Sequence, residues 1–497
     1  MTDKTDKTDN SVADVHQVVI IGTGFGGQAA AINLKQRGYT DFIMLERRAF
    51  AGGTWLQNRY PGAAVDVQSP LYSLSAMPYK WTQMFVTQPE LAQYTQQVFT
   101  TFNLTPHVHL NHEVINSKWD EERRQWCIAI NNKPAIYAKY IINATGPLSM
   151  PVIPNFPGKD RFSGASFHTN NWPDELELSD KRVAIVGSGA SAAQVIPAIV
   201  DEVKSLAVFQ RSPHWIIPRP DITFPAWMQR LLGVKWIYNT LRSAIYWGLE
   251  TRVVGFKYSQ TVLNLFAGGP AKRQLQRQVS DPDLRKALTP DFTIGCKRII
   301  LSNIFYPAIC REHVNLYDKN NGIKTITENG IITADGTALD LDVIIYSTGY
   351  DATDGLISYP VIGKHNTTLA SVWDDYPRAY LGTSVPDFPN YFIVTGPNTG
   401  IGHTSAIFVI EAQMHYIMQA IDTVEAQRKQ SIEPTVQAES QYTDMVHREM
   451  EQTVWQTGGC NSWYKSASGK VIAMFPGFSF IYKRMCVRFK LDDHIIK

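Results

Sequence analysis

The chain has 497 residues, of which 44% are hydrophobic and 19% charged. This length favours two or three domains, and the composition is that of a soluble globular protein rather than a disordered one. A formal net charge of +2, without a lysine- or arginine-rich tract, gives no electrostatic case for a nucleic-acid partner. No uncharged apolar run reaches the about 18–20 residues that a membrane span needs.

The cysteines and the N-terminus bear on the compartment. The five cysteines are scattered and never form a C-x-x-C pair: Cys127, Cys296, Cys310, Cys460 and Cys486. Their odd number and spacing indicate a reducing compartment and argue against a structural zinc site or a redox dithiol. Residues 1–16 are polar and lack the apolar segment of a signal peptide. We therefore expect a flexible N-terminal tail, a cytoplasmic protein and no metal site; no oligomeric state is predicted.

The first nucleotide-binding unit is predicted near the N-terminus. A short apolar run, Val-Val-Ile-Ile, precedes the turn Gly22-x-Gly24-x-x-Gly27, and a helical stretch leads to a second apolar run that ends at Glu46. Gly22 permits a tight turn, Gly24 lets the backbone approach a pyrophosphate, and Gly27 lets the helix pack on the strand. Glu46 is placed to accept hydrogen bonds from a ribose diol, as in sites for FAD or NAD.

A second unit repeats this layout. A strand-like run precedes the turn Gly187-x-Gly189-x-x-Ala192, and Arg211 follows 24 positions after the first glycine, the spacing that also places Glu46. An arginine at this position suits a 2′-phosphate, which its planar guanidinium can bind through two hydrogen bonds. The first unit is therefore predicted to bind FAD and the second NADP.

Residues 216–290 fit neither unit and are interpreted as a helical insertion in the NADP unit. Its apolar residues, including Trp227, Trp236 and Trp247, are expected to face the core, because the charges between them are spread out. The alternative is an amphipathic helix that touches a membrane.

The last third returns to strand and helix. A glycine-rich turn at 395–402 precedes a helical stretch near 407–421, whose N-terminus could face the electron-rich edge of a reduced flavin. A plain strand–helix connection is the alternative.

Together these features predict an α/β protein with two Rossmann-like dinucleotide-binding domains, one for FAD and one for NADP, with a helical insertion in the NADP domain. Both halves of the chain support this prediction: in each, a predicted antiparallel segment is followed by a strand that ends in Thr-Gly, at Gly146 and at Gly349. The expected domains are a tail (1–16), an FAD-binding domain (17–150 and 350–497), a linker (151–180), an NADP-binding domain (181–215 and 291–349) and the insertion (216–290).

The linker carries a longer motif, F-x-G-x-x-x-H-x-x-x-W-P, formed by Phe162, Gly164, His168, Trp172 and Pro173. This motif resembles the fingerprint of type I Baeyer–Villiger monooxygenases, in the flavin-containing monooxygenase-like superfamily. The stretch from Gly52-Gly-Thr-Trp to Asp66 is similar to the family's second signature, and Gly295-Cys-Lys-Arg resembles its active-site arginine segment. Related N- and S-oxygenating flavin monooxygenases share the glycines but usually lack the Trp-Pro ending.

The resemblance implies a reaction. NADPH reduces tightly bound FAD, O2 adds to give a C4a-peroxyflavin, and one oxygen is inserted next to a ketone carbonyl to form an ester or lactone. Arg298 matches the family's catalytic arginine and Asp66 its acidic partner, whereas His168 and Trp172 are expected to orient the linker. Two departures stand out: Gly62-Ala-Ala-Val-Asp66 replaces Gly-Ala-Arg-Cys-Asp, which removes a positive charge near the site, and Ser347 stands where alanine is usual.

The remaining predicted site residues are cofactor contacts. Those for FAD are Gly22, Gly24, Phe25, Gly27, Glu46, Thr54, Trp55, Asp66, Tyr72 and Val114. Those for NADP are Gly187, Gly189, Ser191, Ala192, Gln194, Arg211, Ser212 and Lys297.

Other functions stay open at this stage. A heteroatom oxygenase acting on sulfides or amines is the main alternative, and sulfide oxidation is expected to accompany ketone oxidation. A non-oxygenating pyridine-nucleotide reductase would need a redox dithiol, against which the cysteine spacing counts. A nonenzymatic NADP-sensing module would lack a flavin spectrum. The ketone or sulfide itself is not predicted, although the insertion and Ser462-Trp-Tyr464 are expected to line its pocket.

Overall fold

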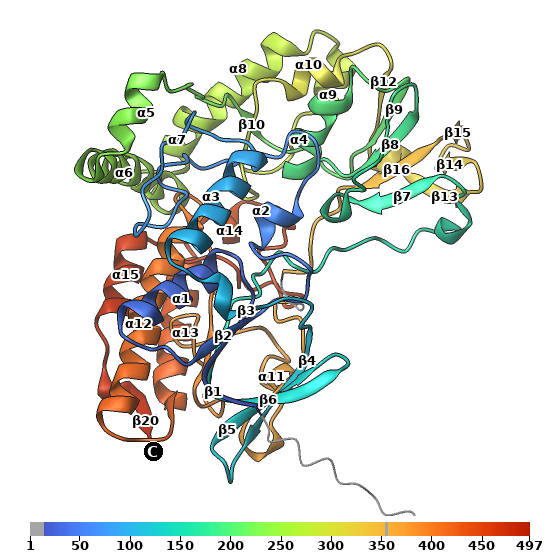
Figure 1. The fold of residues 1–497 in the computed structure, drawn as a ribbon. Helices are drawn as coiled ribbons and strands as arrows, with labels where there is room; N and C mark the ends of the chain where they lie inside the picture. The colour runs from blue at the N-terminus through green and yellow to red at the C-terminus, as the bar shows by residue number, and fades with distance from the viewer. Residues whose placement is uncertain (1–13, 353–355) are drawn as a thin grey trace, which may run out of the picture.

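The first of the two main sheets is mixed and is built from both ends of the chain (Figure 1). The computed structural model describes residues 14–352 and 356–497. Eight strands run in the order β17-β4-β5-β6-β1-β2-β3, with β18 beside β6. Their bounds are β1 (Asp14–Ile21), β2 (Phe42–Leu45), β3 (Val108–His109), β4 (Val114–Asp120), β5 (Gln125–Ile130), β6 (Lys133–Asn143), β17 (Val361–Ile362) and β18 (Tyr391–Ile393).

The pairing in this sheet follows the predicted pattern. β1 pairs in parallel with β2 and β6, and β18 also pairs in parallel with β6. β4, β5 and β6 pair antiparallel and form the excursion that was expected before Gly146. The C-terminal third of the chain therefore contributes strands to the sheet that the N-terminal glycine turn begins.

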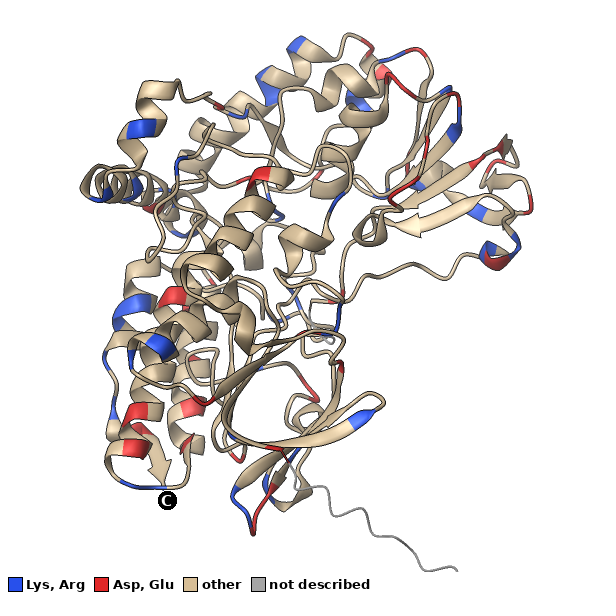
Figure 2. Ribbon diagram, viewed as in Figure 1, with Lys and Arg blue, Asp and Glu red and all other residues tan. Residues whose placement is uncertain are grey.

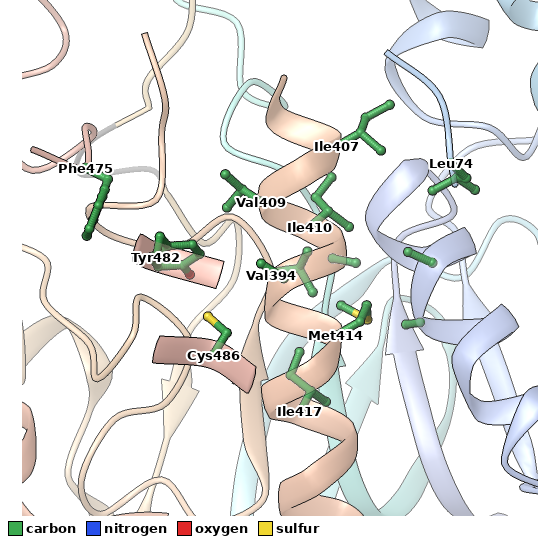
Figure 3. Close-up of a cluster of buried hydrophobic side chains, with 14 of the residues drawn as sticks. Leu74, Val394, Ile407, Val409, Ile410, Met414, Ile417, Phe475, Tyr482 and Cys486 are labelled. Carbon is green, nitrogen blue, oxygen red and sulfur yellow. The ribbon is translucent and has the colours of Figure 1, made fainter. Parts of the chain in front are cut away.

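Helices pack on this sheet through apolar faces. α1 (Phe25–Gln36) and α15 (Ser479–Val487) both pack against the long helix α12 (Ala406–Ala426). Val409, Ile410 and Met414 of α12 are buried together with Leu74 and Tyr482 (Figure 3). This packing fixes the start of α12, and with it the preceding glycine-rich turn.

The second sheet has five parallel strands in the order β12-β9-β8-β16-β7. The strands are β7 (Ala165–His168), β8 (Arg182–Val186), β9 (Ser205–Phe209), β12 (Val314–Tyr317) and β16 (Val343–Tyr346), with helices α4 (Ala190–Ile199) and α10 (Phe305–Ile309). A separate antiparallel sheet contains β13 (Ile323–Thr327), β14 (Gly330–Thr333) and β15 (Ala338–Asp340). The central motif thus supplies an edge strand, β7, as well as a linker.

The insertion consists of α5 (Ala226–Leu232), α6 (Lys235–Glu250), α7 (Gln260–Leu263), α8 (Gly269–Gln278) and α9 (Pro282–Ala287). The expectation that its tryptophans face the core is wrong. Trp227, Trp236 and Trp247 are 63%, 70% and 57% exposed. The opposite face of α6 is buried instead, through Tyr238, Arg242, Tyr246 and Leu249.

Further helices and strands complete the fold. They are α2 (Thr54–Gln57), α3 (Gln88–Thr101), α11 (Leu369–Val372), α13 (Val436–Met450), α14 (Val454–Thr457), β10 (Ile216–Ile217), β11 (Ile300–Leu301), β19 (Ile432–Pro434) and β20 (His494–Ile496). Within the described ranges, no helix is long and apolar enough to cross a bilayer.

Two further expectations need correction: the extent of the N-terminal tail and the argument against a cysteine pair. Residues 14–16 belong to β1, where they pair with residues 136–138, so this part of the predicted tail is structured. The rest of that tail, residues 1–13, lies outside the described residues. Cys296 and Cys460 form a disulfide across 164 positions of sequence. The absence of a C-x-x-C motif says nothing about such a pair, because distant segments meet only in the fold.

Candidate active site

A cavity of about 970 Å³ lies where the first sheet, the insertion and the C-terminal loops meet. The first glycine turn lines it, as do Asp66 and Arg298, Gly248–Leu249 of the insertion, and Trp463–Tyr464. Every residue predicted to contact FAD lines this cavity except Gly27. Its volume is in the range of pockets that hold cofactors and their substrates.

The glycine turn leaves a cradle of backbone at one wall. Gly22 has φ +105°, and a Cβ there would lie 2.4 Å from the carbonyl oxygen of Ala144. A Cβ on Gly27 would lie 2.1 Å from the carbonyl oxygen of Gly22. Gly27 is therefore needed for close packing of α1 on the turn and does not line the cavity. Gly24 is the extended N-cap residue of α1, so the free N–H groups of that helix end face the turn. This is the geometry that accepts a pyrophosphate.

Glu46 directly follows the last residue of β2 and is almost fully buried. The hydroxyl of Thr23 donates a hydrogen bond to it at 2.5 Å, and the backbone N–H of Arg48 donates another at 3.1 Å. These contacts hold a negatively charged acceptor against the cavity, as a ribose diol requires.

Aromatic rings form a second wall. Tyr72 is in edge-to-face contact with both Trp55 and Phe25, each with ring centroids 5.8 Å apart. The Trp55 indole N–H donates to the Tyr72 hydroxyl at 3.4 Å. Thr54 and Val114 line the same cavity. The wall suits a flat ring system, and burial raises the pKa of Tyr72, so its phenol stays neutral.

A guanidinium–carboxylate pair lies in the cavity. Nη2 of Arg298 is 2.5 Å from Oδ1 of Asp66. The Arg298 side chain is 50% exposed, and because this residue lines the cavity, that exposed half faces the cavity space. The Asp66 charge raises the pKa of Arg298 further, so the guanidinium is positive at every working pH. Burial raises the pKa of the neighbouring Tyr464 to about 12.

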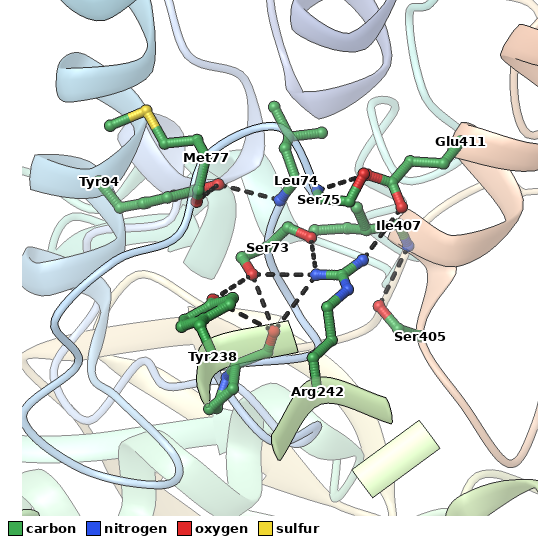
Figure 4. A network of polar contacts seen from close by, with 11 residues as sticks. Ser73, Leu74, Ser75, Met77, Tyr94, Tyr238, Arg242, Ser405, Ile407 and Glu411 are labelled. Atoms are coloured by element: carbon green, nitrogen blue, oxygen red, sulfur yellow. Dashed lines mark hydrogen bonds and ion pairs between the residues drawn. The ribbon is translucent and has the colours of Figure 1, made fainter. Parts of the chain in front are cut away.

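A buried polar network sets the Tyr72 segment against the insertion (Figure 4). Nη1 of Arg242, on α6, donates to the carbonyl oxygens of Ser73 and Pro70, at 2.5 and 3.2 Å. Nη2 of the same residue pairs with Glu411 on α12 at 3.0 Å. One side chain therefore ties three segments together beside the cavity.

The central motif contacts this site through Asn170 rather than through its histidine. The amide of Asn170 donates to Asn58 and to Tyr350, both at 3.1 Å, and the residue lines the cavity. His168 is buried beneath it, and its Nδ1 accepts the N–H of Asn170 at 3.0 Å. Burial lowers the pKa of His168 to about 4, so the ring is neutral. Trp172 packs on Phe167 and on the core of the second sheet.

The predicted NADP residues lie outside this cavity, at the second glycine turn. Gly187 has φ +123°, and Gly189 is the extended N-cap residue of α4. Ala192 is buried against the sheet, and Ser191 lies on the same helix. Gln194 instead bonds to the first unit, donating to the Ala64 carbonyl oxygen at 2.9 Å and accepting from Tyr60 at 3.0 Å.

Basic groups gather beyond that turn. Lys297 Nζ donates to the hydroxyl of Ser212 at 2.9 Å. Burial, and then the charge of Arg211, lowers the pKa of Lys297. His214, which the sequence did not single out, is also here: burial, Lys297 and Arg211 lower its pKa to about 4. His214 is therefore neutral, and the neighbouring cations Lys297 and Arg211 suit a phosphate.

A second pair that the sequence did not reveal lies at the far wall. Glu250, the last residue of α6, and His403, in the glycine-rich turn before α12, are both buried with Oε2 and Nε2 3.1 Å apart. The carboxylate also accepts from the N–H of Ser479 at 2.5 Å and from its hydroxyl at 2.8 Å. Burial raises the pKa of Glu250, but its hydrogen bonds to His403 and Ser479 outweigh burial and lower it overall. His403 lines the cavity.

The disulfide lies next to the same site. Cys296 precedes Arg298 by two positions, and Cys460 precedes Trp463 by three. Both cysteines are buried. The bond therefore joins the segment that carries the guanidinium to the loop that carries Trp463 and Tyr464.

Two glycine-rich turns, each between a parallel strand and a helix, define a protein with two dinucleotide-binding units and a shared cavity at the first. In agreement, the pyridine nucleotide-disulphide oxidoreductase family model matches residues 19–236, which include both turns and end before Cys296.

Whole-chain comparisons narrow this class. A Baeyer–Villiger monooxygenase of Pseudomonas aeruginosa is 37% identical over 95% of this chain and 90% of its own length. The closed crystal structure of cyclohexanone monooxygenase superposes with a TM-score of 0.89 at 27% identity, covering 98% of this chain and 99% of that one. The structure of the OTEMO complex with FAD and NADP gives a TM-score of 0.88 at 26% identity, covering 97% and 99%. The chain belongs to the Baeyer–Villiger monooxygenase family, as the motif resemblance indicated.

Proposed function

We propose that this chain is an FAD-dependent monooxygenase that uses NADPH and O2 to insert one oxygen atom next to a ketone carbonyl, giving an ester or lactone. One ketone, one O2, one NADPH and one proton give one ester, NADP⁺ and water. The observation that most directly supports this proposal is the Arg298–Asp66 pair, which lines the same cavity as the first glycine turn. Family membership supports the same reaction.

The residues present fit both cofactors. The Gly22–Gly24 cradle, Glu46 and the Trp55–Tyr72 wall would hold FAD, which when bound and reduced supplies the electrons that activate O2. Arg211, Ser212 and Lys297 would hold the 2′-phosphate of NADP. We therefore propose that the domain formed by residues 17–150 and 350–497 binds FAD, and that the domain formed by residues 181–215 and 291–349 binds NADP. The pairing of β17 and β18 into the first sheet supports it.

The proposed role of Arg298 is electrostatic. Oxygen insertion develops negative charge on an oxygen atom, and a fixed cation in a confined cavity stabilises that charge without taking part in proton transfer. Arg298 fits because its pKa lies far above any working pH. Asp66 holds the guanidinium in place through the 2.5 Å contact.

The walls limit stray proton donors. A reactive oxygen anion is quenched by an acidic neighbour, and a site that keeps it must offer only weak acids. Tyr464 meets this requirement because burial raises its pKa to about 12. In this proposal His168 and Trp172 are positioning residues: His168 accepts the N–H of Asn170, Trp172 packs on Phe167, and neither lines the cavity.

Small-molecule ketones are the proposed substrates, with sulfides as a second class. A sulfide is itself the nucleophile and needs no carbonyl activation, so the same site serves it with less help from Arg298. The cavity walls around Leu249, Phe256 and Phe266 are apolar, which favours apolar substrates. A cytoplasmic location is part of the proposal, since NADPH is supplied inside cells, and no nucleic-acid partner is proposed.

Activity assays on the FAD-loaded protein test the function. NADPH oxidation should rise when an apolar ketone is added, and the ester or lactone should appear in equal amount. Arg298→Ala should slow ester formation about 10²–10³-fold, whereas Arg311→Ala, which removes a surface pair with Asp201, should leave it unchanged. Sulfoxide formation without any ester would favour a heteroatom oxygenase. Oxidation of NADPH with only hydrogen peroxide formed would contradict both.

A further inference from the structure

The insertion exposes an unusual amount of aromatic surface. Trp236 and Trp247 lie on one face of α6, with Thr240 and Ser243 between them, and are 70% and 57% exposed. Trp227, on the neighbouring α5, is 63% exposed. Large aromatic side chains in water cost free energy, and groups of them mark interaction surfaces.

This surface continues onto the C-terminal helix. The ring of Trp247 lies 5.8 Å from that of Phe480, which stacks on Phe478 at 5.1 Å. Phe478 in turn lies 6.4 Å from Tyr258, which is 58% exposed. Trp236, Trp247, Tyr258 and Phe480 are called the aromatic surface below. In Figure 1 the helices that carry it, α6 and α15, lie along the left edge of the molecule.

Most charges in the segments that carry the aromatic surface are basic, although Glu449 pairs with Lys257 beside Tyr258 at 2.6 Å. Between Ile222 and Ser280 the chain has eight basic residues and one acid, and that acid, Glu250, is buried. The exposed basic residues are Arg230, Lys235, Arg252, Lys272, Arg273 and Arg277. α15 and its cap add Lys483, Arg484 and Arg488, again without an acid. Figure 2 shows basic positions along α5 and α15 at this edge.

We propose that the aromatic surface docks on an anionic lipid membrane. Tryptophan rings favour the boundary between headgroups and acyl chains, and flanking Lys and Arg bind anionic headgroups. A second copy of the chain is a poorer partner, because a two-fold contact would bring the two sets of cations together. The docking is peripheral and requires no spanning helix.

The cavity opens beside this surface. Phe266 lines the cavity and is 74% exposed, so it marks the mouth. Gly248, which directly follows Trp247, and Arg252, five positions after Trp247, also line the cavity. Docking would therefore place the mouth near the lipid, and apolar ketones dissolved in the membrane would enter from there. This delivery step rests on the proposed function, whereas the docking itself does not.

Vesicle co-sedimentation of the full FAD-loaded protein tests the docking. Vesicles of phosphatidylcholine with phosphatidylglycerol should bind it, and vesicles of phosphatidylcholine alone should bind it about tenfold less. High salt should release it. The double variant Trp236→Ser/Trp247→Ser should lose about tenfold in binding, whereas Ile304→Ser/Val436→Ser, which removes two exposed apolar residues elsewhere, should not. Flavin content and circular dichroism check that each variant is folded.

A charge reversal gives a second measure. Arg230→Glu/Lys235→Glu should weaken binding to the anionic vesicles, and Lys204→Glu/Lys324→Glu, at exposed positions outside the insertion, should leave it unchanged. Equal binding by the tryptophan variant, or equal binding to neutral vesicles, would overturn the proposal. A dimer that dissociates in the tryptophan variant, with no vesicle binding, would identify a copy–copy interface instead. Vesicle binding without any ketone oxidation would keep the docking and reject the proposed function.

Discussion

Replacing Asp66 by asparagine keeps the shape of the side chain and removes its charge, and so isolates what the ion pair contributes. Arg298 keeps its positive charge in this variant, because its pKa is far above the working range even without help. The two side chains are 50% and 29% exposed, so screening limits the pair to about 1 kcal/mol. We therefore expect kcat for ester formation to fall about fivefold. Arg298→Ala should cost about 10²–10³.

A double-mutant cycle tests whether Asp66 acts only through Arg298. If Asp66 acts only by holding Arg298, then Asp66→Asn should have little further effect in the Arg298→Ala protein. Steady-state kcat for ester formation is measured in the four proteins at one saturating ketone concentration. Asp201→Asn, at a surface pair with Arg311, is the matched control and should be silent. An additional fivefold loss in the Arg298→Ala background would refute the reasoning and give Asp66 a role of its own.

Three other perturbations have expected outcomes. Lys297→Met should raise KM for NADPH about tenfold and leave KM for NADH almost unchanged, because only NADPH carries the phosphate; equal effects on both would remove Lys297 from the phosphate site. Glu250→Gln should lower the free energy of unfolding by about 3 kcal/mol, since it leaves His403 and Ser479 without their charged acceptor. The pKa of Glu250 is lowered in the fold, so in denaturant titrations its contribution should be present above the ordinary carboxyl pKa and lost as pH falls below it; a loss at alkaline pH would contradict this. Cys460→Ser should destabilise the protein by about 4–5 kcal/mol in denaturant melts and make it insensitive to reductant, whereas Cys310→Ser should do neither.

The strands and the first site could be predicted from sequence for simple reasons. Buried parallel strands need continuous apolar runs, and the predicted runs before Glu46 and before Gly187 correspond to β2 and β8. The glycine turn requires Gly22 and Gly27 because any side chain there would meet the backbone. The position of Glu46, 24 residues after Gly22, predicted a contact with a ribose, and Glu46 lines the cavity.

The features that the sequence predicted wrongly or did not reveal also have physical explanations. α6 carries aromatic residues on both faces, Trp236 and Trp247 on one and Tyr238 and Tyr246 on the other, so apolar content could not choose the buried face. Glu250 and His403 are 153 positions apart, and no local pattern reveals a pair that only tertiary packing creates. The same holds for the Cys296–Cys460 bond.

The origin of the inserted oxygen tests the central claim most directly. The FAD-loaded protein is given NADPH, an apolar ketone and ¹⁸O2 in ordinary water, and the ester is analysed by mass spectrometry. The account predicts one ¹⁸O atom in every ester molecule, in the ring or chain position, with the carbonyl oxygen unlabelled. An ester without label, or NADPH oxidation that yields labelled hydrogen peroxide and no ester, would contradict it.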